Sequence, residues 1–300
     1  MITRRQITLM ALALGPMMPA VARASALSVS RFAQPGDGSV NTWILNGQNA
    51  VVVIDTQRAL SAGRQAADAV AAIGKPVAAI LITHPHPDHF SGLPSFLDRF
   101  PGTPVYASAA TRDIMAADSN GFIAATKAVL GDDAPEVQPL PTHTFTDQEL
   151  LVFDTVRLVV DEIGRGEADT MSMFYAPDEG MLFPGDVVEN SMTPFMMEGH
   201  TLDWLAQVDR IVAAYGPLTP MVYPGHGAAG TMALFDKQRT LLTFVQDAVR
   251  AALPDGVTAA EINDIVATYH GRYPNHPPVA AIPNLMRENV RAVAGELARP

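Results

Sequence analysis

Residues 84–89 read His-Pro-His-Pro-Asp-His, which places three imidazoles and one carboxylate within six residues of chain. Groups of this kind are costly to bury unless they share a cation, and Zn²⁺ accepts such a mixture of nitrogen and oxygen ligands. The apolar run before them, residues 77–83, is typical of a buried strand that delivers a loop. We expect Pro85 and Pro87 to stiffen this loop and keep it from becoming helical. The motif therefore predicts a metal site at the end of a buried strand.

Three later segments repeat the arrangement of an apolar strand, a glycine-containing turn and one side chain able to bind metal. They end in Gly164-Arg165-Gly166-Glu167, Pro184-Gly185-Asp186 and Pro224-Gly225-His226-Gly227. Glycine suits such positions because it permits tight turns. Together with the His-x-His-x-Asp-His motif, these turns resemble the metallo-β-lactamase superfamily over about residues 27–230.

This resemblance implies a centre of two metal ions, each with its own ligands, and a carboxylate that bridges both. The implied ligands are His84, His86 and Glu167 for the first ion, Asp88, His89 and His226 for the second, and Asp186 as the bridge. The ions are expected to be two Zn²⁺, with Mn²⁺ or Fe²⁺ as alternatives. Thr83 and Asp55 are expected to contact the ligands from behind, because metal-bound histidines donate their other N–H to such partners.

Glu167 departs from the pattern of the family, which normally has a third histidine in a Gly-x-Gly-His turn. A carboxylate here resembles the alkylsulfatase-like branches of the superfamily, and its oxygen can bind Zn²⁺ at a distance similar to that of imidazole. It also shifts the preference toward harder ions such as Mn²⁺ or Fe²⁺. Two alternatives stay open: Glu167 forms a salt bridge with Arg165 and leaves a single ion, or Asp169 takes its place as the ligand.

The resemblance further implies a hydrolase in which a hydroxide held by the ions attacks an ester, lactone, β-lactam or related bond of a small molecule. Asp88 is the candidate catalytic residue, because its carboxylate could orient the nucleophile or carry a proton to the leaving group. His200 and the apolar loop 192–197 are candidates to line the substrate mouth, and the loop could equally be buried packing. An iron-dependent oxidoreductase of the same superfamily and a non-catalytic metal-binding protein are the alternatives.

Residues 1–24 have a basic start, an apolar middle and a small-residue cleavage site, as a secretory signal peptide does. Thr3-Arg4-Arg5-Gln6-Ile7 also resembles a twin-arginine signal, and an ordinary signal with a chance arginine pair is the alternative. We therefore expect a periplasmic or secreted protein with no stable membrane anchor after signal removal. The chain has no cysteine, so neither disulfides nor thiolate ligands contribute.

The charge balance excludes one class of partner. Loss of the three arginines in residues 1–24 would take the formal net charge from −11 to −14. So acidic a chain is unsuited to binding a phosphate backbone, and we expect a small-molecule substrate and no nucleic acid. An apolar content of 48% with 17% charged residues argues against disorder.

The alternation of strands and helices predicts an α/β fold. Strands are expected at residues 42–45, 51–55, 78–83, 105–107, 149–153, 156–160, 171–175 and 181–183, and helices at 61–73 and 91–99. With the resemblance, this pattern predicts a four-layer αββα sandwich for residues 27–230. Residues 231–300 carry helical spacing and a capping box at Thr258, which predicts a C-terminal helical segment packed on the core. That segment could also cover the active-site mouth or form a homodimer contact.

Overall fold

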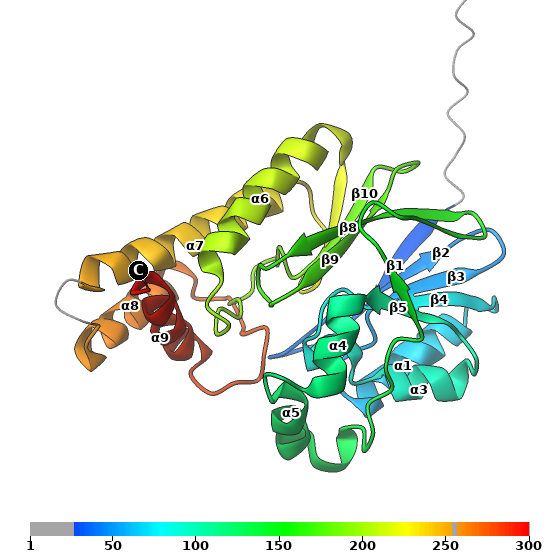
Figure 1. The fold of residues 1–300 in the computed structure, drawn as a ribbon, viewed down its shortest axis with the longest axis horizontal. Coiled ribbons are helices and arrows are strands. Elements are labelled where there is room, and N and C mark those ends of the chain that lie inside the picture. Colours follow the sequence, from blue (N-terminus) through cyan, green and yellow to red (C-terminus); the bar gives the residue numbers. More distant parts are fainter. Residues whose placement is uncertain (1–26, 254–256, 300) are drawn as a thin grey trace, which may run out of the picture.

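The computed structural model describes residues 27–253 and 257–299, so the expected signal peptide lies outside the described residues. Two β-sheets lie at the centre of the molecule, as Figure 1 shows. The first sheet has six strands in the order β1-β2-β3-β4-β5-β6. Its strands are β1 (Ser28–Phe32), β2 (Thr42–Asn46), β3 (Val51–Ile54), β4 (Val77–Leu81), β5 (Val105–Ser108) and β6 (His143–Phe145). Strands β1 to β3 are antiparallel and β3 to β6 are parallel.

The second sheet has five strands in the order β11-β10-β9-β8-β7. They are β7 (Leu150–Phe153), β8 (Val156–Gly164), β9 (Met171–Ala176), β10 (Met181–Gly185) and β11 (Met221–Pro224). Strands β7 to β10 alternate in direction, and β11 runs parallel to β10. The carboxyl ends of β8, β10 and β11 therefore lie at the same edge of this sheet.

Helices cover the outer face of each sheet. The first sheet carries α1 (Leu60–Ala71), α2 (Pro87–Phe90), α3 (Leu93–Arg99), α4 (Ala109–Ala117) and α5 (Phe122–Leu130) on its side of the molecule. The second sheet carries α6 (Thr201–Tyr215), α7 (Ala233–Ala252), α8 (Ala259–Arg272) and α9 (Leu285–Leu297) on the opposite side. Short 3-10 turns, η1 (Gly131–Asp133) and η2 (Gly216–Leu218), follow α5 and α6.

Apolar side chains fill the space between the layers. One cluster joins the facing sides of the sheets and includes Leu45, Leu158 and Phe174. A second lies between the first sheet and α1 and α3, and a third between the second sheet and α6 to α9. Burying both faces of each sheet removes a large apolar area from water, at about 25 cal/mol per Å². The αββα sandwich expected from the sequence is confirmed.

The expected strands all form, with bounds that differ by a few residues. The prediction about Pro87 was wrong, because Pro87 is the first residue of α2 and the metal motif enters a helix there. Proline is favoured at the first position of a helix, because an N–H there has no acceptor within the helix and because the fixed φ of proline suits a helix. The capping box at Thr258 is confirmed: its side chain and that of Glu261 cap the start of α8.

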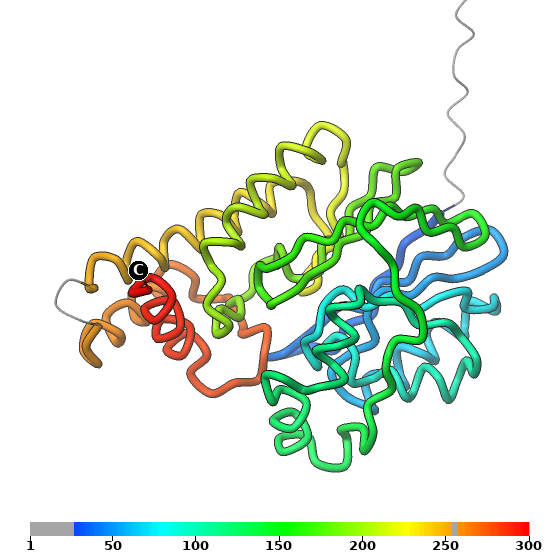
Figure 2. Tube along the Cα trace, in the orientation of Figure 1, coloured from blue at the N-terminus to red at the C-terminus, as the bar shows by residue number. Residues whose placement is uncertain are grey.

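The C-terminal helices pack into the same apolar cluster as α6 and the second sheet. Helix α7 buries Leu234, Leu241, Leu242, Val245 and Val249, which share one face at helical spacing. Between α8 and α9 the chain runs back to the N-terminal half of the molecule, a path visible in the tube of Figure 2. In the described part of the chain, no helix combines the length and apolar character needed to cross a membrane.

A buried carboxylate links α9 to the start of α6. Glu296 accepts hydrogen bonds from the Thr201 amide at 2.9 Å, the Thr201 hydroxyl at 2.7 Å and the Leu202 amide at 2.8 Å. These amides lie at the positive end of the helix and have no acceptor inside it. The C-terminal helix thereby supplies the N-terminal cap of a helix almost a hundred residues earlier.

We expect Glu296→Ala to lower the free energy of unfolding by about 2 kcal/mol, because it leaves buried donors without their charged acceptor. Chemical denaturation of both proteins measures the difference. Glu288→Ala on the same helix is the matched control, since Glu288 forms a part-exposed ion pair with Arg291, and should cost less than about 1 kcal/mol. Equal losses in the two variants would contradict the capping role of Glu296.

Candidate metal centre

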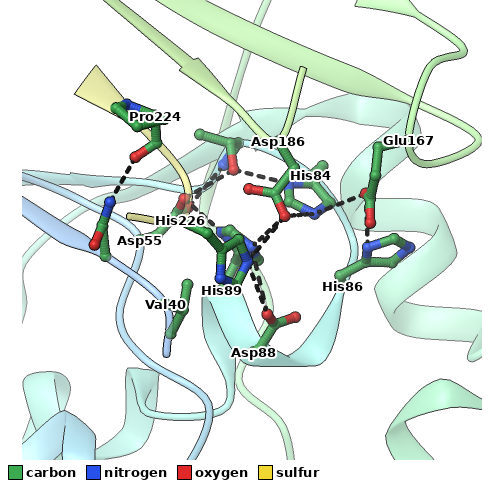
Figure 3. Close-up of polar contacts among 12 residues, drawn as sticks. Val40, Asp55, His84, His86, Asp88, His89, Glu167, Asp186, Pro224 and His226 are labelled. Atoms are coloured by element: carbon green, nitrogen blue, oxygen red, sulfur yellow. Dashed lines mark hydrogen bonds and ion pairs between the residues drawn. The ribbon is translucent and has the colours of Figure 1, made fainter. Parts of the chain in front are cut away.

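The His-Pro-His-Pro-Asp-His motif follows β4 after only two residues, Ile82 and Thr83. His84, His86 and His89 are buried. The other three candidate ligands follow β8, β10 and β11, whose carboxyl ends share one edge of the second sheet. All seven residues singled out from the sequence thus lie together between the two sheets, and Figure 3 shows them converging.

The carboxylate of Asp186 occupies the middle of this group. Its Oδ2 atom lies 3.0 Å from His226 Nε2, 3.3 Å from His89 Nε2 and 4.0 Å from His84 Nε2. The three imidazoles belong to both of the ligand sets expected from the sequence. This position is the one that a carboxylate shared between two ions would take.

Glu167 lies with the first two histidines of the motif. Its Oε2 is 2.9 Å from His86 Nδ1 and 3.5 Å from His84 Nε2. Arg165, the partner considered for it, pairs instead with Asp169 at 3.8 Å. Asp169 in turn lies 2.8 Å from His200 and belongs to a neighbouring group of side chains. The geometry therefore groups Glu167, and not Asp169, with His84 and His86.

Asp88 and His226 form the other side of the centre together with His89. Asp88 Oδ2 lies 3.3 Å from His226 Nε2 and 3.6 Å from His89 Nε2. The side chain of Asp88 is 23% exposed, whereas those of His89 and His226 are fully buried. Asp88 is therefore the member of this group that reaches the solvent side.

Each of the four imidazoles has its outward nitrogen held by a partner. His84 Nδ1 lies 2.9 Å from the Thr83 hydroxyl, and His89 Nδ1 lies 2.7 Å from Asp55 Oδ2. His226 Nδ1 donates to the backbone carbonyl of Ser39 at 2.6 Å. The fourth contact joins His86 Nε2 to Glu198 Oε1 at 2.8 Å. A proton on the outward nitrogen leaves the lone pair of the inward nitrogen free to bind a metal.

Asp55 and Thr83 reinforce this arrangement, as the sequence led us to expect. The Thr83 hydroxyl donates to Asp55 Oδ2 at 2.8 Å, and its amide donates to Asp55 Oδ1 at 2.9 Å. Since the hydroxyl proton is used there, the Thr83 oxygen accepts the Nδ1 proton of His84. One buried carboxylate thus fixes the tautomers of both His84 and His89.

The inward atoms fit divalent cations. In the described part of the chain, buried side-chain atoms without a hydrogen-bond partner include His84 Nε2, His89 Nε2, His226 Nε2, Glu167 Oε2 and Asp186 Oδ1. An unpartnered buried polar atom costs free energy, and native proteins leave few of them. Imidazole nitrogens and carboxylate oxygens at tetrahedral spacing are the ligands that Zn²⁺ takes. The residues present therefore suit divalent metal binding.

The buried carboxylates and imidazoles of the centre shift one another's pKa values. Burial opposes ionisation of Asp186, but the His226 and His89 imidazoles outweigh it and hold the pKa of this carboxyl well below its ordinary range. Burial and the neighbouring His89 hold the pKa of His84 well below 6.5, so its imidazole is neutral. Burial raises the pKa of Glu167 to about 7, although the His86 imidazole lowers it. Burial lowers the pKa values of His86, His89 and His226, but the Glu167 carboxylate beside His86 and the Asp186 carboxylate beside the other two outweigh it and raise them well above 6.5. A metal ion bound here would therefore displace protons from these imidazoles.

The turn that carries His226 is fixed by the first sheet. Asn41 donates to the carbonyls of Pro224 and Gly227, each at 2.7 Å, and the Trp43 indole donates to Pro224 at 2.8 Å. A Cβ atom on Gly225 would lie 1.7 Å from Asp186 Oδ1. Only glycine leaves room for the bridging carboxylate at that point.

Two buried carboxylates near the centre were not expected from the sequence. Glu198 contacts His86 and comes from the loop before α6, where no motif marks it. Glu189 lies against Glu167 and Asp186, and both of its oxygens lack a hydrogen-bond partner. Burial and the Asp186 carboxylate raise the pKa of Glu189 well above its ordinary value, which favours its neutral form.

With this geometry in view, comparison with known protein families identifies the chain. The sequence model of the metallo-beta-lactamase superfamily matches residues 35–226. The chain belongs to the metallo-beta-lactamase superfamily. A metallo-beta-lactamase and a sec-alkylsulfatase are among the solved structures that share its fold. A search of curated proteins found no match to the sequence.

Solved structures resemble this superfamily member over most of its length. A metallo-beta-lactamase family protein from Thermus thermophilus is 22% identical, with a TM-score of 0.64. The match covers 89% of this chain and 91% of the Thermus protein. A metallo-beta-lactamase from Pontibacter korlensis is 21% identical, with 73% of this chain and 96% of its own covered and a TM-score of 0.57.

A stereoselective inverting sec-alkylsulfatase from Pseudomonas sp. is 18% identical with a TM-score of 0.62. The match covers 89% of this chain and 49% of the alkylsulfatase. This superfamily member therefore spans about half the length of that enzyme. At these identities the likeness concerns the fold.

Glu198→Gln tests the contact with His86. The amide removes the charge that holds the outward nitrogen, and we expect about 10- to 100-fold weaker metal binding. Competition with a fluorescent chelator measures the affinity. Glu136→Gln, on an exposed side chain, should leave it unchanged. An unaltered affinity in Glu198→Gln would mean that His86 needs no such support.

Proposed function

We propose that this protein is a dinuclear metal-dependent hydrolase, with two Zn²⁺ as the favoured ions. It would cleave an ester, lactone, β-lactam or related bond of a small molecule. The observation that carries this proposal is the orientation of four buried imidazoles, each with one nitrogen held outward and the other directed at the carboxylates. A histidine that is buried only for packing would not require three further imidazoles that face the same carboxylates.

His84, His86 and Glu167 would hold the first ion, Asp88, His89 and His226 the second, and Asp186 both. When bound, such ions supply Lewis-acid activation of water and of the scissile bond. The protein's own part is to fix these ligands before substrate arrives and to exclude bulk water from them. Five of the seven side chains are at most 2% exposed. Two carboxylates among the ligands of the first ion leave room for Mn²⁺ or Fe²⁺ as alternatives.

Asp88 is the group best placed to move a proton. Its side chain is the most exposed of the ligand set and lines a cavity that opens on the centre. His89 and His226 outweigh its burial and hold the pKa of its carboxyl well below the ordinary value, so Asp88 is ionised at neutral pH. An ionised carboxylate beside the substrate can accept a proton from the nucleophile and pass it to the leaving group.

The substrate would be a small molecule, because the acidic chain would repel a nucleic acid. Some solved structures of this fold are metallo-beta-lactamases and others are of an alkylsulfatase, so substrates vary widely on this fold. Fold alone therefore cannot choose among the bonds named above. The side chains that line the cavity beside Asp88 narrow the class of substrate further.

Metal analysis of the purified protein tests the proposal. We expect about two ions per chain, loss of ester hydrolysis on removal of the ions by a chelator, and about one ion in Glu167→Ala, because that variant loses a ligand of the first ion. Asp169→Ala removes a nearby carboxylate outside the set and should retain two. One ion in every protein would contradict a dinuclear centre, and iron with oxygen-dependent turnover would indicate an oxidoreductase instead.

We also propose that residues 1–24 direct export to the periplasm or the medium. The support is the basic start and apolar stretch of the sequence, which signal peptides share. Expression in a bacterial host followed by fractionation and N-terminal mass analysis should find a chain that begins near residue 25 outside the cytoplasm. Replacement of Arg4 and Arg5 by lysine should block export only if the twin-arginine route is used. Retention of the full-length chain in the cytoplasm would contradict export.

A further inference from the structure

A cavity of about 300 Å³ opens onto the metal centre and has mainly apolar walls. His86, Asp88, Glu167 and Asp186 form its inner end. Six apolar side chains, here called the apolar pocket, form much of the rest: Phe122, Val129, Leu130, Phe195, Met197 and Ile282. A cavity of this volume fits the lower end of the range for small-molecule sites.

The helix that forms one wall is apolar without being buried. Helix α5 reads Phe-Ile-Ala-Ala-Thr-Lys-Ala-Val-Leu, yet none of its residues is buried. Val129 is 71% exposed, and Met197 across the cavity is 37% exposed. Exposed apolar side chains gathered around a cavity mark a surface that a ligand covers. Because this cavity is continuous with the metal centre, the ligand is the substrate.

Arg58 is the arginine that lines the same cavity. Its guanidinium donates to the backbone carbonyl of Asp37 and packs against Gly38, where a Cβ would lie 2.4 Å from Nη1. Among the described residues, no aspartate or glutamate forms an ion pair with it. In a chain with 31 acidic residues and 20 basic ones, an arginine directed into a cavity without a carboxylate partner is available to an anion. A guanidinium has five N–H donors and matches a carboxylate in shape.

We propose that the substrate is an ester or lactone with an apolar body that carries a carboxylate, and that Arg58 binds this carboxylate while the apolar pocket encloses the body. The proposal rests on the proposed hydrolase function, because it takes the metal centre as the place where the scissile bond lies. Arg58 is then a specificity-determining residue that contacts substrate away from the reacting atoms. A substrate without the carboxylate would lose one charge-assisted interaction and keep the apolar one.

Calorimetry with octanoate and octanedioate tests this assignment on the metal-loaded protein without relying on turnover. The two probes have the same chain length, and only the second can place one carboxylate at the centre and another at Arg58. We expect octanedioate to bind about tenfold more tightly. Diacids of six to ten carbons should show an optimum, with about threefold change for each methylene that the apolar pocket buries.

Arg58→Gln should bring the two probes to within about twofold of each other, and Arg58→Lys should restore part of the difference. Arg64→Gln, on an exposed side chain of α1, is the matched control and should retain the full preference. Equal binding of the two probes to the unaltered protein overturns the proposal, as does a preference that survives Arg58→Gln or a failure of both probes to bind.

Turnover separates this inference from the proposed function. The 4-nitrophenyl ester of octanoate and the 4-nitrophenyl monoester of octanedioate should be hydrolysed with kcat/KM values that differ about tenfold, and Arg58→Gln should remove the difference through KM. If neither ester is hydrolysed while the binding preference persists, the hydrolase function fails and the anion site stands. If both are hydrolysed equally, the assignment of Arg58 fails and the hydrolase stands.

Discussion

The rest of this structure depends on carboxylates and imidazoles crowded together in a largely buried region. Asp186 Oδ2 alone has three imidazole nitrogens within 4.0 Å. Such a cluster is stable only when cations or fixed protons balance its charges. The two sheets enclose this cluster, and each imidazole has a partner that holds its outward nitrogen. The geometry of the cluster therefore does not depend on a single loop.

The topology explains how residues far apart in sequence reach one point. Parallel strands end at the same edge, and β8, β10 and β11 each end in a turn that presents one side chain there. The first sheet contributes its motif directly after β4 and also holds the turn before His226 through Asn41 and Trp43. Neither sheet alone supplies all seven candidate ligands. The site therefore lies at the strand ends where the two sheets meet, beside the apolar cluster that packs between them.

Much of this arrangement could be predicted because the signals are local. The motif at residues 84–89 and the glycine turns before Asp186 and His226 are recognisable in the sequence, and apolar runs indicate the strands. Glu198 gave no such signal, since its role follows from a contact with His86 across 112 residues. Helix α5 was not predicted for a different physical reason. Hydrophobic periodicity indicates which residues are buried, whereas the apolar side chains of α5 that we assign to substrate binding are not buried. The error at Pro87 came from treating proline only as a helix breaker.

The contact between the Ser39 carbonyl and His226 joins segments 187 residues apart in the chain. Contacts of such long range form late in folding, because the intervening loop must close first. A metal ion that His226 helps to hold would thus be captured with full affinity only by a chain whose two halves have already come together. By mass action, free metal at about 100 times its dissociation constant would then stabilise the native state by about 2.7 kcal/mol. The supply of metal where the chain folds therefore helps to determine how long the folded protein lasts.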